Sequence, residues 1–404
     1  MTMTMTKISS DRLRQLIADE SSHATAFRRD LHMHPELGYE ETRTAGKIRA
    51  ALDDAGIRHA DGLAGGTGTL AHLPGEASHA VALRADIDAL PIEEEGSPAW
   101  KSTIPGRMHA CGHDGHATIL TTTARVLARI AQETRLPRPV TFVFQPAEEG
   151  GAGGKKMCEE GCLDGRVIGP RVERIYGLHG WTGFPVGVVG TKPGPLFACS
   201  DRFEITITGE GSHAAFPHQS RDPVLAAAQV ILALQSIVSR NVDPLDSAVV
   251  SATIVRAGSA MNVIPSSATI SGTARALTPD VRDLIERRFG EVTRAAASVH
   301  GCQADPRYIR GYPVTSNDAR ETERFDRLAR ETFGNARVKP FERPVMGGED
   351  FSYYAERVPS CFFLLGLLRD GQASMPSLHH PRFDFNDDAI ATGVEMFCRL
   401  ALET

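Results

Sequence analysis

The chain has 404 residues, of which 41% are hydrophobic and 23% are charged, and its formal net charge is −6. This length is enough for two domains, and the composition is typical of an ordinary soluble globular protein. The negative net charge, without a dense run of lysine and arginine, argues against a nucleic-acid-binding protein.

The cysteines and the apolar segments indicate the compartment. The seven cysteines are odd in number and scattered, which suits a reducing cytoplasm better than a disulfide framework. The segment Met1–Lys7 lacks the apolar core of a signal peptide, and no apolar run reads as long enough to span a bilayer. We therefore expect a cytoplasmic protein with no membrane partner.

The first part of the chain alternates helical and strand patterns. Helices are predicted from Ser10, over 42–55 and over 117–130, and buried strands over 80–83, 140–144 and 174–178. A helix from Asn317 and a strand over 361–365 resume this pattern late in the chain. The alternation predicts an α/β domain with a mixed, mostly parallel sheet and helices on both faces.

The pattern changes near residue 194. In chain order, a strand (201–208), a helix (222–238), two strands (248–255 and 268–274), a helix (279–299) and a strand (304–310) are predicted there. This β-α-β-β-α-β order is the ferredoxin-like arrangement. We therefore predict an inserted α+β domain at 194–311 and a discontinuous first domain made of 1–193 and 312–404.

The segment Met108–His116 concentrates histidine, cysteine and aspartate, which are the side chains that bind divalent transition ions. Cys111 and His113 are two residues apart, and the neighbouring glycines allow a tight loop. The CxxC pairs of a structural zinc site are missing. Any further ligands must therefore come from distant parts of the sequence.

Further polar residues follow predicted strands, at the edge where open α/β sheets bind ligands. They are Asp86 and Asp88, Glu148 and Glu149, and His179, with His379 in a late turn. Each has an ordinary alternative as a solvated acid, a helix cap or a hydrogen-bonded histidine. Together they match a two-metal hydrolase in which one glutamate binds metal and its neighbour acts as general base.

Short motifs of histidine, glycine and acidic residues recur along the whole chain. They are Asp30-Leu-His-Met-His-Pro-Glu-Leu-Gly-Tyr-Glu-Glu41, Arg84-Ala-Asp-Ile-Asp-Ala-Leu-Pro91, His109-Ala-Cys-Gly-His-Asp-Gly-His116, Phe144-Gln-Pro-Ala-Glu-Glu-Gly150, Gly177-Leu-His179, Gly211-Ser-His-Ala-Ala215, Met261-Asn-Val-Ile-Pro265, Gly347-Gly-Glu-Asp-Phe351 and Leu378-His-His-Pro381. With these motifs the chain resembles the aminoacylase-like dinuclear metallopeptidases. Within them it is most similar to the amidohydrolase branch of hippurate hydrolases, N-acyl-L-amino-acid amidohydrolases and plant auxin-conjugate hydrolases.

The resemblance implies a zinc-peptidase-like catalytic domain and an inserted lid that also forms the interface of a homodimer or higher oligomer. It implies two divalent metal ions as cofactors, which could be zinc, manganese, nickel or cobalt. By motif position, the implied ligands are Cys111, His113, Glu149, His179 and His379. Cys111 would bridge the ions, where other branches of the family use an aspartate.

The resemblance also implies the remaining roles. Glu148 would be the general base, and Asp86 would hold a metal-ligand imidazole in the right orientation. In the lid, His213 and Asn262 would reach the scissile carbonyl, at least one of them from the partner subunit. Arg275 would bind the free carboxylate of the substrate's amino acid, for which a guanidinium is suited.

These roles predict an enzyme that hydrolyses the amide bond of N-acyl-L-amino acids, releasing a carboxylic acid and a free amino acid. One alternative is a dipeptidase or carboxypeptidase of the same family. A second is a cysteine hydrolase that uses Cys111 with His113 or His116, which leaves the distant ligands unexplained. A third is a binding module that has lost catalysis, against which stands the presence of Glu148 and of every implied ligand.

Overall fold

The computed structural model describes residues 8–403, so the segment Met1–Lys7, with its predicted lack of a signal peptide, lies outside the described residues. The chain divides into two compact units. Unit 1 comprises Met1–Gly194, Ser316–Glu342 and Asp350–Thr404, and unit 2 comprises Pro195–Thr315 and Arg343–Glu349. The segment Arg343–Glu349 therefore belongs to the second unit, although the sequence places it in the first domain.

Unit 1 is built on a seven-stranded sheet with the order β1-β2-β4-β3-β5-β15-β6. Its strands are β1 (Arg58–Leu63), β2 (Gly68–Leu73), β3 (Ala80–Asp86), β4 (Val140–Gln145), β5 (Val172–Pro185), β6 (Val189–Gly190) and β15 (Ser360–Leu368). The four central strands β4, β3, β5 and β15 are parallel, whereas β1, β2 and β6 pair antiparallel at the two edges. The predicted α/β fold with a mixed sheet is confirmed, with a parallel centre.

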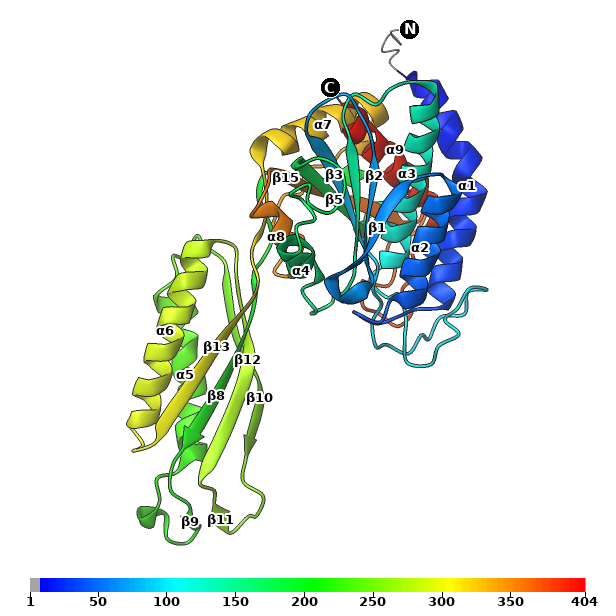
Figure 1. The fold of residues 1–404 in the computed structure, drawn as a ribbon. Helices are drawn as coiled ribbons and strands as arrows, with labels where there is room; N and C mark the ends of the chain where they lie inside the picture. The colour runs from blue at the N-terminus through cyan, green and yellow to red at the C-terminus, as the bar shows by residue number, and fades with distance from the viewer. Residues whose placement is uncertain (1–7, 404) are drawn as a thin grey trace. The chain divides into compact units, whose positions relative to one another are not determined.

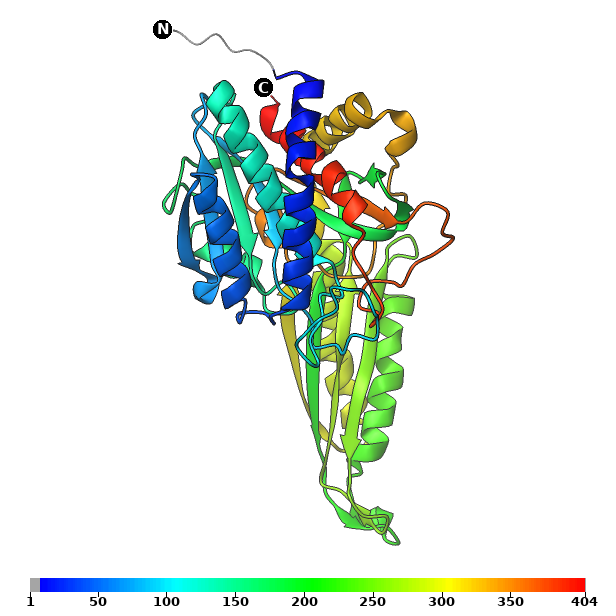
Figure 2. The same cartoon turned by 90° about the vertical axis from the view of Figure 1, so that its right-hand side faces the viewer.

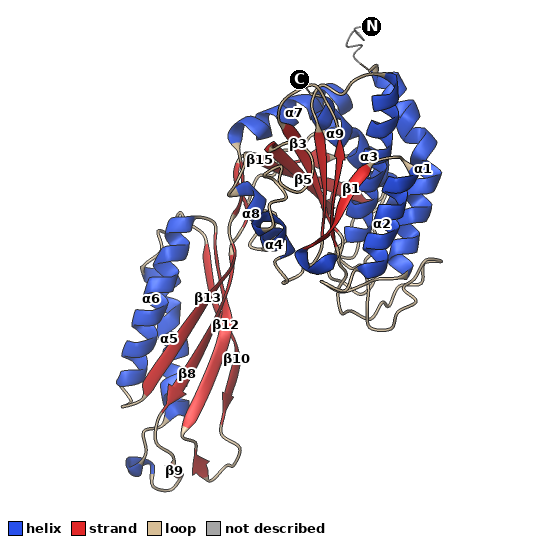
Figure 3. Cartoon of the chain, in the orientation of Figure 1, coloured by secondary structure: helices blue, strands red, loops and turns tan. Residues whose placement is uncertain are grey.

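Helices cover the sheet of unit 1. They are α1 (Ser10–Met33), α2 (Thr42–Asp54), α3 (His113–Glu133), α4 (Gly153–Glu159), α7 (Ala319–Phe333), α8 (Ser352–Ala355) and α9 (Ile390–Leu402). Helices α1, α2, α3 and α9 lie on one side of the sheet, and α4 and α8 lie on the other (Figures 1 and 3). Every residue of β3 and β4 is buried, as expected for central strands that are covered on both faces.

Helix α3 begins four residues earlier than the sequence predicts. Gly112 precedes it with φ of 92°, a left-handed conformation that glycine adopts without steric cost, and Asp114 lies in its first turn. His113 and His116 therefore lie on the first turn of a helix and not on an irregular loop. Short 3-10 turns complete the chain: η1 (Ala64–Gly66), η2 (Pro217–Gln219), η3 (Asn335–Arg337) and η4 (Asp387–Ala389).

Unit 2 has the predicted β-α-β-β-α-β order. Its main elements are β8 (Ser200–Thr208), α5 (Pro223–Arg240), β10 (Ala248–Ala257), β12 (Ser267–Ala276), α6 (Pro279–Ser298) and β13 (Gln303–Tyr312). The strands form an antiparallel sheet in the order β10-β12-β8-β13. In β8 burial alternates strictly, because one face of the sheet is covered by α5 and α6 and the other is open (Figure 2).

Two small ladders complete the strands of the chain. Strand β9 (Ser212–His213) pairs with β11 (Val263–Ile264), at the end of the long strands of unit 2 (Figure 1). Strand β7 (Gly194–Phe197) pairs with β14 (Thr315–Asn317).

Helix α5 has the length and apolar composition that a membrane-spanning helix requires, contrary to the expectation that no apolar run is long enough. A third of its length is buried, through side chains such as Val230 and Leu234 that pack on the sheet of unit 2. The helix that covers a sheet in a globular domain passes the same test of length and composition. The feature is therefore weak support for a membrane span.

Candidate metal centre

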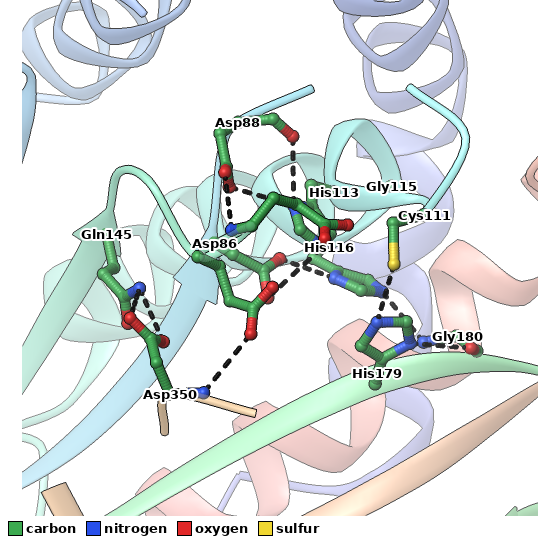
Figure 4. A network of polar contacts seen from close by, with 12 residues as sticks. Asp86, Asp88, Cys111, His113, Gly115, His116, Gln145, His179, Gly180 and Asp350 are labelled. Atoms are coloured by element: carbon green, nitrogen blue, oxygen red, sulfur yellow. Dashed lines mark hydrogen bonds and ion pairs between the residues drawn. The ribbon is translucent and has the colours of Figure 1, made fainter. Parts of the chain in front are cut away.

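The polar residues predicted at the strand ends gather at the C-terminal edge of the parallel strands in unit 1. Strand β3 ends at Asp86 and β4 ends at Gln145, directly before the loop that carries the two adjacent glutamates. His179 lies within β5, which continues to Pro185 instead of ending at residue 178 as predicted, and the first turn of α3 brings His113 to the same place (Figure 4). The parallel sheet thus assembles residues that are distant in sequence, as predicted.

Cys111, His113 and His179 form one candidate ligand group, in which one atom of each lies within 4.8 Å of the others. The Nδ1 atom of His113 contacts the main-chain oxygen of Asp88 at 3.0 Å, which leaves the buried Nε2 atom without a hydrogen-bond partner. The Nδ1 atom of His179 contacts the oxygen of Gly180 at 2.8 Å, and its Nε2 atom lies 3.3 Å from the Cys111 sulfur. With Nδ1 protonated on each ring, Nε2 is the atom of each imidazole that can bind a cation.

Cys111 also belongs to a second group, together with Glu149 and His379. The Nε2 atom of His379 lies 3.1 Å from Oε1 of Glu149. The side chain of His379 is 52% exposed, so this group faces solvent, whereas the first group is buried. Two sets of ligands that share one thiol are the arrangement that a bridging cysteine requires.

The charges at this point favour a bound cation. Burial raises the pKa of the Cys111 thiol well above its usual range, and the carboxylates of Glu149 and Glu148 raise it further. Burial disfavours a charged His113, but the carboxylates of Asp86 and Asp88 outweigh this and raise its pKa to about 10. Without a cation the acidic surroundings therefore keep protons on groups that would otherwise be ligands. A divalent ion can replace those protons, so the donor set fits a metal centre.

Glu148 lies beside the first group but has different contacts. The main-chain nitrogen of Asp350 donates to its Oε1 atom at 3.3 Å. One of its carboxylate oxygens lies within 4.8 Å of ligand atoms of His113 and Glu149. The side chain is buried, with 7% of the residue exposed. Glu148 is thus placed next to the candidate ligands, as a general base must be.

Asp86 makes its shortest imidazole contact with His116, which is outside the ligand groups around Cys111, although Asp86, His113 and His116 form a further group of possible ligand atoms. Its Oδ1 atom lies 2.6 Å from Nδ1 of His116, and the nitrogen of Gly180 donates to Nε2 of His116 at 2.8 Å. Both ring nitrogens of His116 are therefore occupied, which supports the interpretation of His116 as a scaffold residue. Oδ2 of Asp86 lies 3.8 Å from Nε2 of His113 and 2.7 Å from Nη1 of Arg84.

Asp88 is the carboxylate that contacts two candidate ligands directly. Its Oδ1 atom lies 3.1 Å from Nδ1 of His113, and its Oδ2 atom accepts from the main-chain nitrogen of Glu149 at 2.9 Å. The sequence indicates Asp88 only as an acid that follows a predicted strand, and it assigns this residue no role. The spacing of two residues from Asp86 puts both carboxylates at the strand end, but it does not indicate which one reaches His113.

The ring of Phe385 packs the loop of His379 against the start of α3. A Cβ atom on Gly115 would overlap the ring of Phe385, and one on Gly112 would lie 3.0 Å from the same ring. The main-chain nitrogen of His379 also donates to the oxygen of Ala110 at 2.8 Å. The two glycines therefore let the His379 loop lie directly against the segment of Cys111 and His113.

The three predicted lid residues lie in unit 2 at two different places. His213 is on β9 opposite Val263, and the nitrogen of Ala214 donates to the oxygen of Asn262, so His213 and Asn262 lie close together. Arg275 is near the end of β12, opposite Val249. Seven residue steps of about 3.3 Å separate the ends of the β12–β8 ladder, so Arg275 is more than roughly 20 Å from the other two.

Known proteins resemble this chain over almost all of its length. A model of the peptidase family M20/M25/M40 matches residues 82–403. The IAA-amino acid hydrolase ILR1-like 2 of Arabidopsis thaliana is 41% identical over 381 residues, which are 93% of this chain and 84% of that protein. The N-acetylcysteine deacetylase of Bacillus subtilis (strain 168) is 39% identical over 389 residues, which are 96% of this chain and 98% of that protein.

A solved structure is similar as well. The crystal structure of the Bacillus subtilis YXEP protein, a dinuclear metal binding peptidase from the M20 family, has a TM-score of 0.82 and 35% sequence identity to this chain. The similarity covers 95% of this chain and 98% of that one. Both units of the chain therefore have counterparts in a protein described as binding two metal ions.

Proposed function

Because the chain belongs to the peptidase family M20/M25/M40 and to its amidohydrolase branch, we propose that it hydrolyses the amide bond of N-acyl-L-amino acids, hippurate-like compounds among them. The products would be a carboxylic acid and a free amino acid. The family predicted from the motifs is confirmed. The names of two relatives, an IAA-amino acid hydrolase and an N-acetylcysteine deacetylase, support this class of substrate.

The observation that carries the proposal is the pair of ligand groups that share Cys111. Cys111, His113 and His179 would hold one divalent ion, and Cys111, Glu149 and His379 the other. The orphaned Nε2 atom of buried His113 supports this assignment. A thiolate favours zinc, nickel or cobalt over magnesium, and manganese is also a candidate. When bound, two such ions polarise the amide carbonyl and lower the pKa of water.

Glu148 would move the proton in this reaction. Its carboxylate would take a proton from the attacking water and later give it to the nitrogen of the leaving amine. The bond from the main-chain nitrogen of Asp350 holds one of its oxygens in place. Asp86, Asp88 and His116 would orient the neighbouring imidazoles rather than react.

The lid residues would come from two copies of the chain. His213 and Asn262 would contact the scissile carbonyl, and Arg275 would bind the substrate carboxylate. Within one copy of unit 2, however, Arg275 lies more than roughly 20 Å from His213, farther than one small substrate can bridge. The two groups can therefore act on one substrate only if two copies contribute, which supports the implied homodimer.

An apolar surface of unit 2 would form the contact between these copies. Leu225 and Leu232 are 55% and 69% exposed on the same face of α5, and Ile254 and Val255 are exposed on β10. Strand β10 is at the edge of its sheet, so its outer side can pair with another strand. Exposed apolar side chains beside an unpaired strand edge are typical of an association surface.

The alternatives have weaker support. A nucleophilic Cys111 needs a lowered pKa, but burial and two glutamates raise the pKa of this thiol. A dipeptidase or carboxypeptidase activity would use the same metal centre, so substrate tests must distinguish it from the proposed activity.

The experiment is a hydrolysis screen of the purified full chain with N-benzoyl-, N-acetyl- and dipeptide substrates and with added zinc or manganese. We expect release of the free amino acid from N-acyl-amino acids, loss of turnover with a chelator, and recovery when the ion is added back. Turnover that survives chelation and leaves an acyl-enzyme in the mass spectrum would instead show a cysteine hydrolase. A metal-loaded protein that cleaves no substrate would show a binding module.

A further inference from the structure

The residue directly before the proposed base has an unusual backbone conformation. Ala147 has φ of 54°, in the left-handed region that residues other than glycine rarely adopt. Such a conformation persists only when the surrounding contacts impose it. The direction in which the chain leaves Ala147 sets where the side chain of Glu148 begins. The contacts that hold Ala147 therefore also determine the position of Glu148.

Two segments of the chain contact Ala147, one before α2 and one at the start of α4. Its main-chain nitrogen donates to Oε1 of Glu41 at 2.8 Å, and its main-chain oxygen accepts from the nitrogen of Gly153 at 3.1 Å. A Cβ atom on Gly38 would lie 3.1 Å from both carbons Cα and Cβ of Ala147, so the segment before Glu41 packs tightly on it. Of these contacts, only the one from Glu41 is a side-chain bond to the main chain of Ala147.

The carboxylate of Glu41 accepts the Ala147 bond and makes no cap bond to its own helix. Glu41 is the N-cap residue of α2, yet Glu36 accepts from the first amides of that helix instead. The carboxylate is fully buried, and its second oxygen accepts from the hydroxyl of Thr67 at 2.9 Å. Thr67, which directly precedes β2, thus fixes one oxygen of Glu41. The other oxygen accepts from the loop that carries Glu148.

We propose that Glu41 is a positioning residue for the reaction, which fixes the left-handed turn at Ala147 and thereby places the carboxylate of Glu148. This role rests on the proposed function of Glu148 as general base. Among the described hydrogen bonds, the Glu41 side chain makes none to the candidate metal ligands Cys111, His113, Glu149, His179 and His379, so its loss affects the position of the base more than the binding of the ions.

A neutral acceptor should serve nearly as well as the carboxylate. Burial, with the nearby carboxylate of Asp88, raises the pKa of Glu41 to about 7, so the wild-type side chain is itself partly neutral near pH 7. A glutamine keeps one oxygen for the amide of Ala147 and can donate to the hydroxyl oxygen of Thr67. The Glu41→Gln variant is therefore the conservative partner of Glu41→Ala.

The test compares Glu41→Ala, Glu41→Gln and Thr67→Val in the full chain. For Glu41→Ala we expect kcat on an N-acetyl amino acid to fall by about 10- to 100-fold with KM changed by less than about threefold, because small displacements of a reacting group cost this much. Glu41→Gln should stay within about threefold of wild type, and Thr67→Val should lose activity to a smaller extent than Glu41→Ala. A matched control is Glu160→Ala, which removes a carboxylate that accepts from the main-chain nitrogen of Ala64 instead.

A second readout does not depend on activity. Amide hydrogen exchange of the peptide over 145–153 should be faster in Glu41→Ala than in wild type and unchanged in Glu41→Gln and Glu160→Ala. If no N-acyl amino acid is cleaved, the proposed function fails. The exchange result still tests whether Glu41 fixes the loop over 145–153. Equal kcat in Glu41→Ala and wild type, unchanged exchange, or loss of bound metal in parallel with kcat would each overturn the positioning role.

Discussion

Glu148 and Glu149 are adjacent in sequence, but their surroundings suit them to different tasks. An oxygen of Glu149 lies 3.1 Å from His379, and its main-chain nitrogen is held by Asp88. Glu148 instead accepts from the nitrogen of Asp350. The strained turn at Ala147 and the bond of Glu149 to Asp88 together let two neighbouring side chains reach the same cluster from different sides.

Replacing Glu148 by glutamine should separate proton transfer from metal binding. The amide has nearly the same shape but cannot accept a proton, so we expect kcat to fall by at least about 100-fold. Metal content, measured by elemental analysis, should stay at the wild-type value. A variant that retains most of its turnover would contradict the role of Glu148 as base.

Cys111 allows a second test at the same scale. In Cys111→Asp a carboxylate can still contact both ligand groups, so we expect both ions to be retained, whereas Cys111→Ala should lose at least one of them. Binding can be followed by titration of the metal-free protein with zinc. Equal metal content in the two variants would show that this side chain does not bridge the ions.

The sequence predicts the individual ligands better than their supports. Cys111, His113 and His179 belong to short local motifs, and the structure brings them together. The bond from Glu41 to Ala147 joins residues that are 106 positions apart, and no local spacing indicates it. Which of Asp86 and Asp88 contacts His113 likewise depends on the path of the strand end and not on residue type.

At the scale of elements, the start of α3 decides whether the site can assemble. The helix begins at His113, and its first turn is covered by the ring of Phe385, for which Gly115 leaves room. This contact connects the segment of Cys111 with the loop of His379. The glycines of the motif are therefore explained by packing as well as by loop flexibility.

The Gly115→Ala variant should weaken this contact. The added methyl group overlaps the ring of Phe385, and overpacking of this kind costs about 1–3 kcal/mol. We expect a lower Tm and weaker metal binding through the displaced His379. A matched control is Gly46→Ala in the middle of α2, where a Cβ atom meets nothing within 4 Å, and which should stabilise by about 0.5–1 kcal/mol. A Gly115→Ala variant as stable as wild type would contradict the packing argument.

Two of the elements that the sequence does not predict are the edge strand β1 and the helix α9. Strand β1 is largely exposed at the sheet edge, with only Leu63 buried, so it lacks the apolar run of a central strand. Most residues of helix α9 are buried, because the helix packs between α1, α3 and α7. Both elements depend on neighbours that local patterns do not reveal.

At the scale of the whole molecule, the chain order of strands and helices predicts the ferredoxin-like arrangement of unit 2, and side-chain caps fix the starts of its two helices. Asp222 and Thr278 accept from the first amides of α5 and α6. The addition of Arg343–Glu349 to this unit was not predicted, since it returns from a distant part of the chain. What associates with the exposed face of α5 is a question of assembly and not of fold.

Charged side chains on the exposed face of α5 should dissociate the proposed homodimer. Leu225→Glu with Leu232→Glu places two carboxylates in the proposed contact, so we expect the dimer dissociation constant to rise at least tenfold in analytical ultracentrifugation. Activity should fall with dimer content, because His213 would then be missing. Val299→Glu is the control, since Val299 is 76% exposed at the end of α6 and belongs to neither α5 nor β10. A wild-type chain that sediments as an active monomer would contradict the proposed assembly.

The contact of Phe385 with Gly112 and Gly115 joins two segments that are far apart in the chain, and this has a consequence for synthesis. Cys111 and His113 leave the ribosome early, but the loop that carries His379 and Phe385 follows only after most of the chain has been made. At about 5–20 residues per second, the delay between them is roughly 10 to 50 s. Once His179 has also been made, the nascent chain can offer the first ligand group but not the second, which needs His379. Full metal loading must therefore follow completion of the chain, and the supply of free ions at that moment becomes part of its maturation.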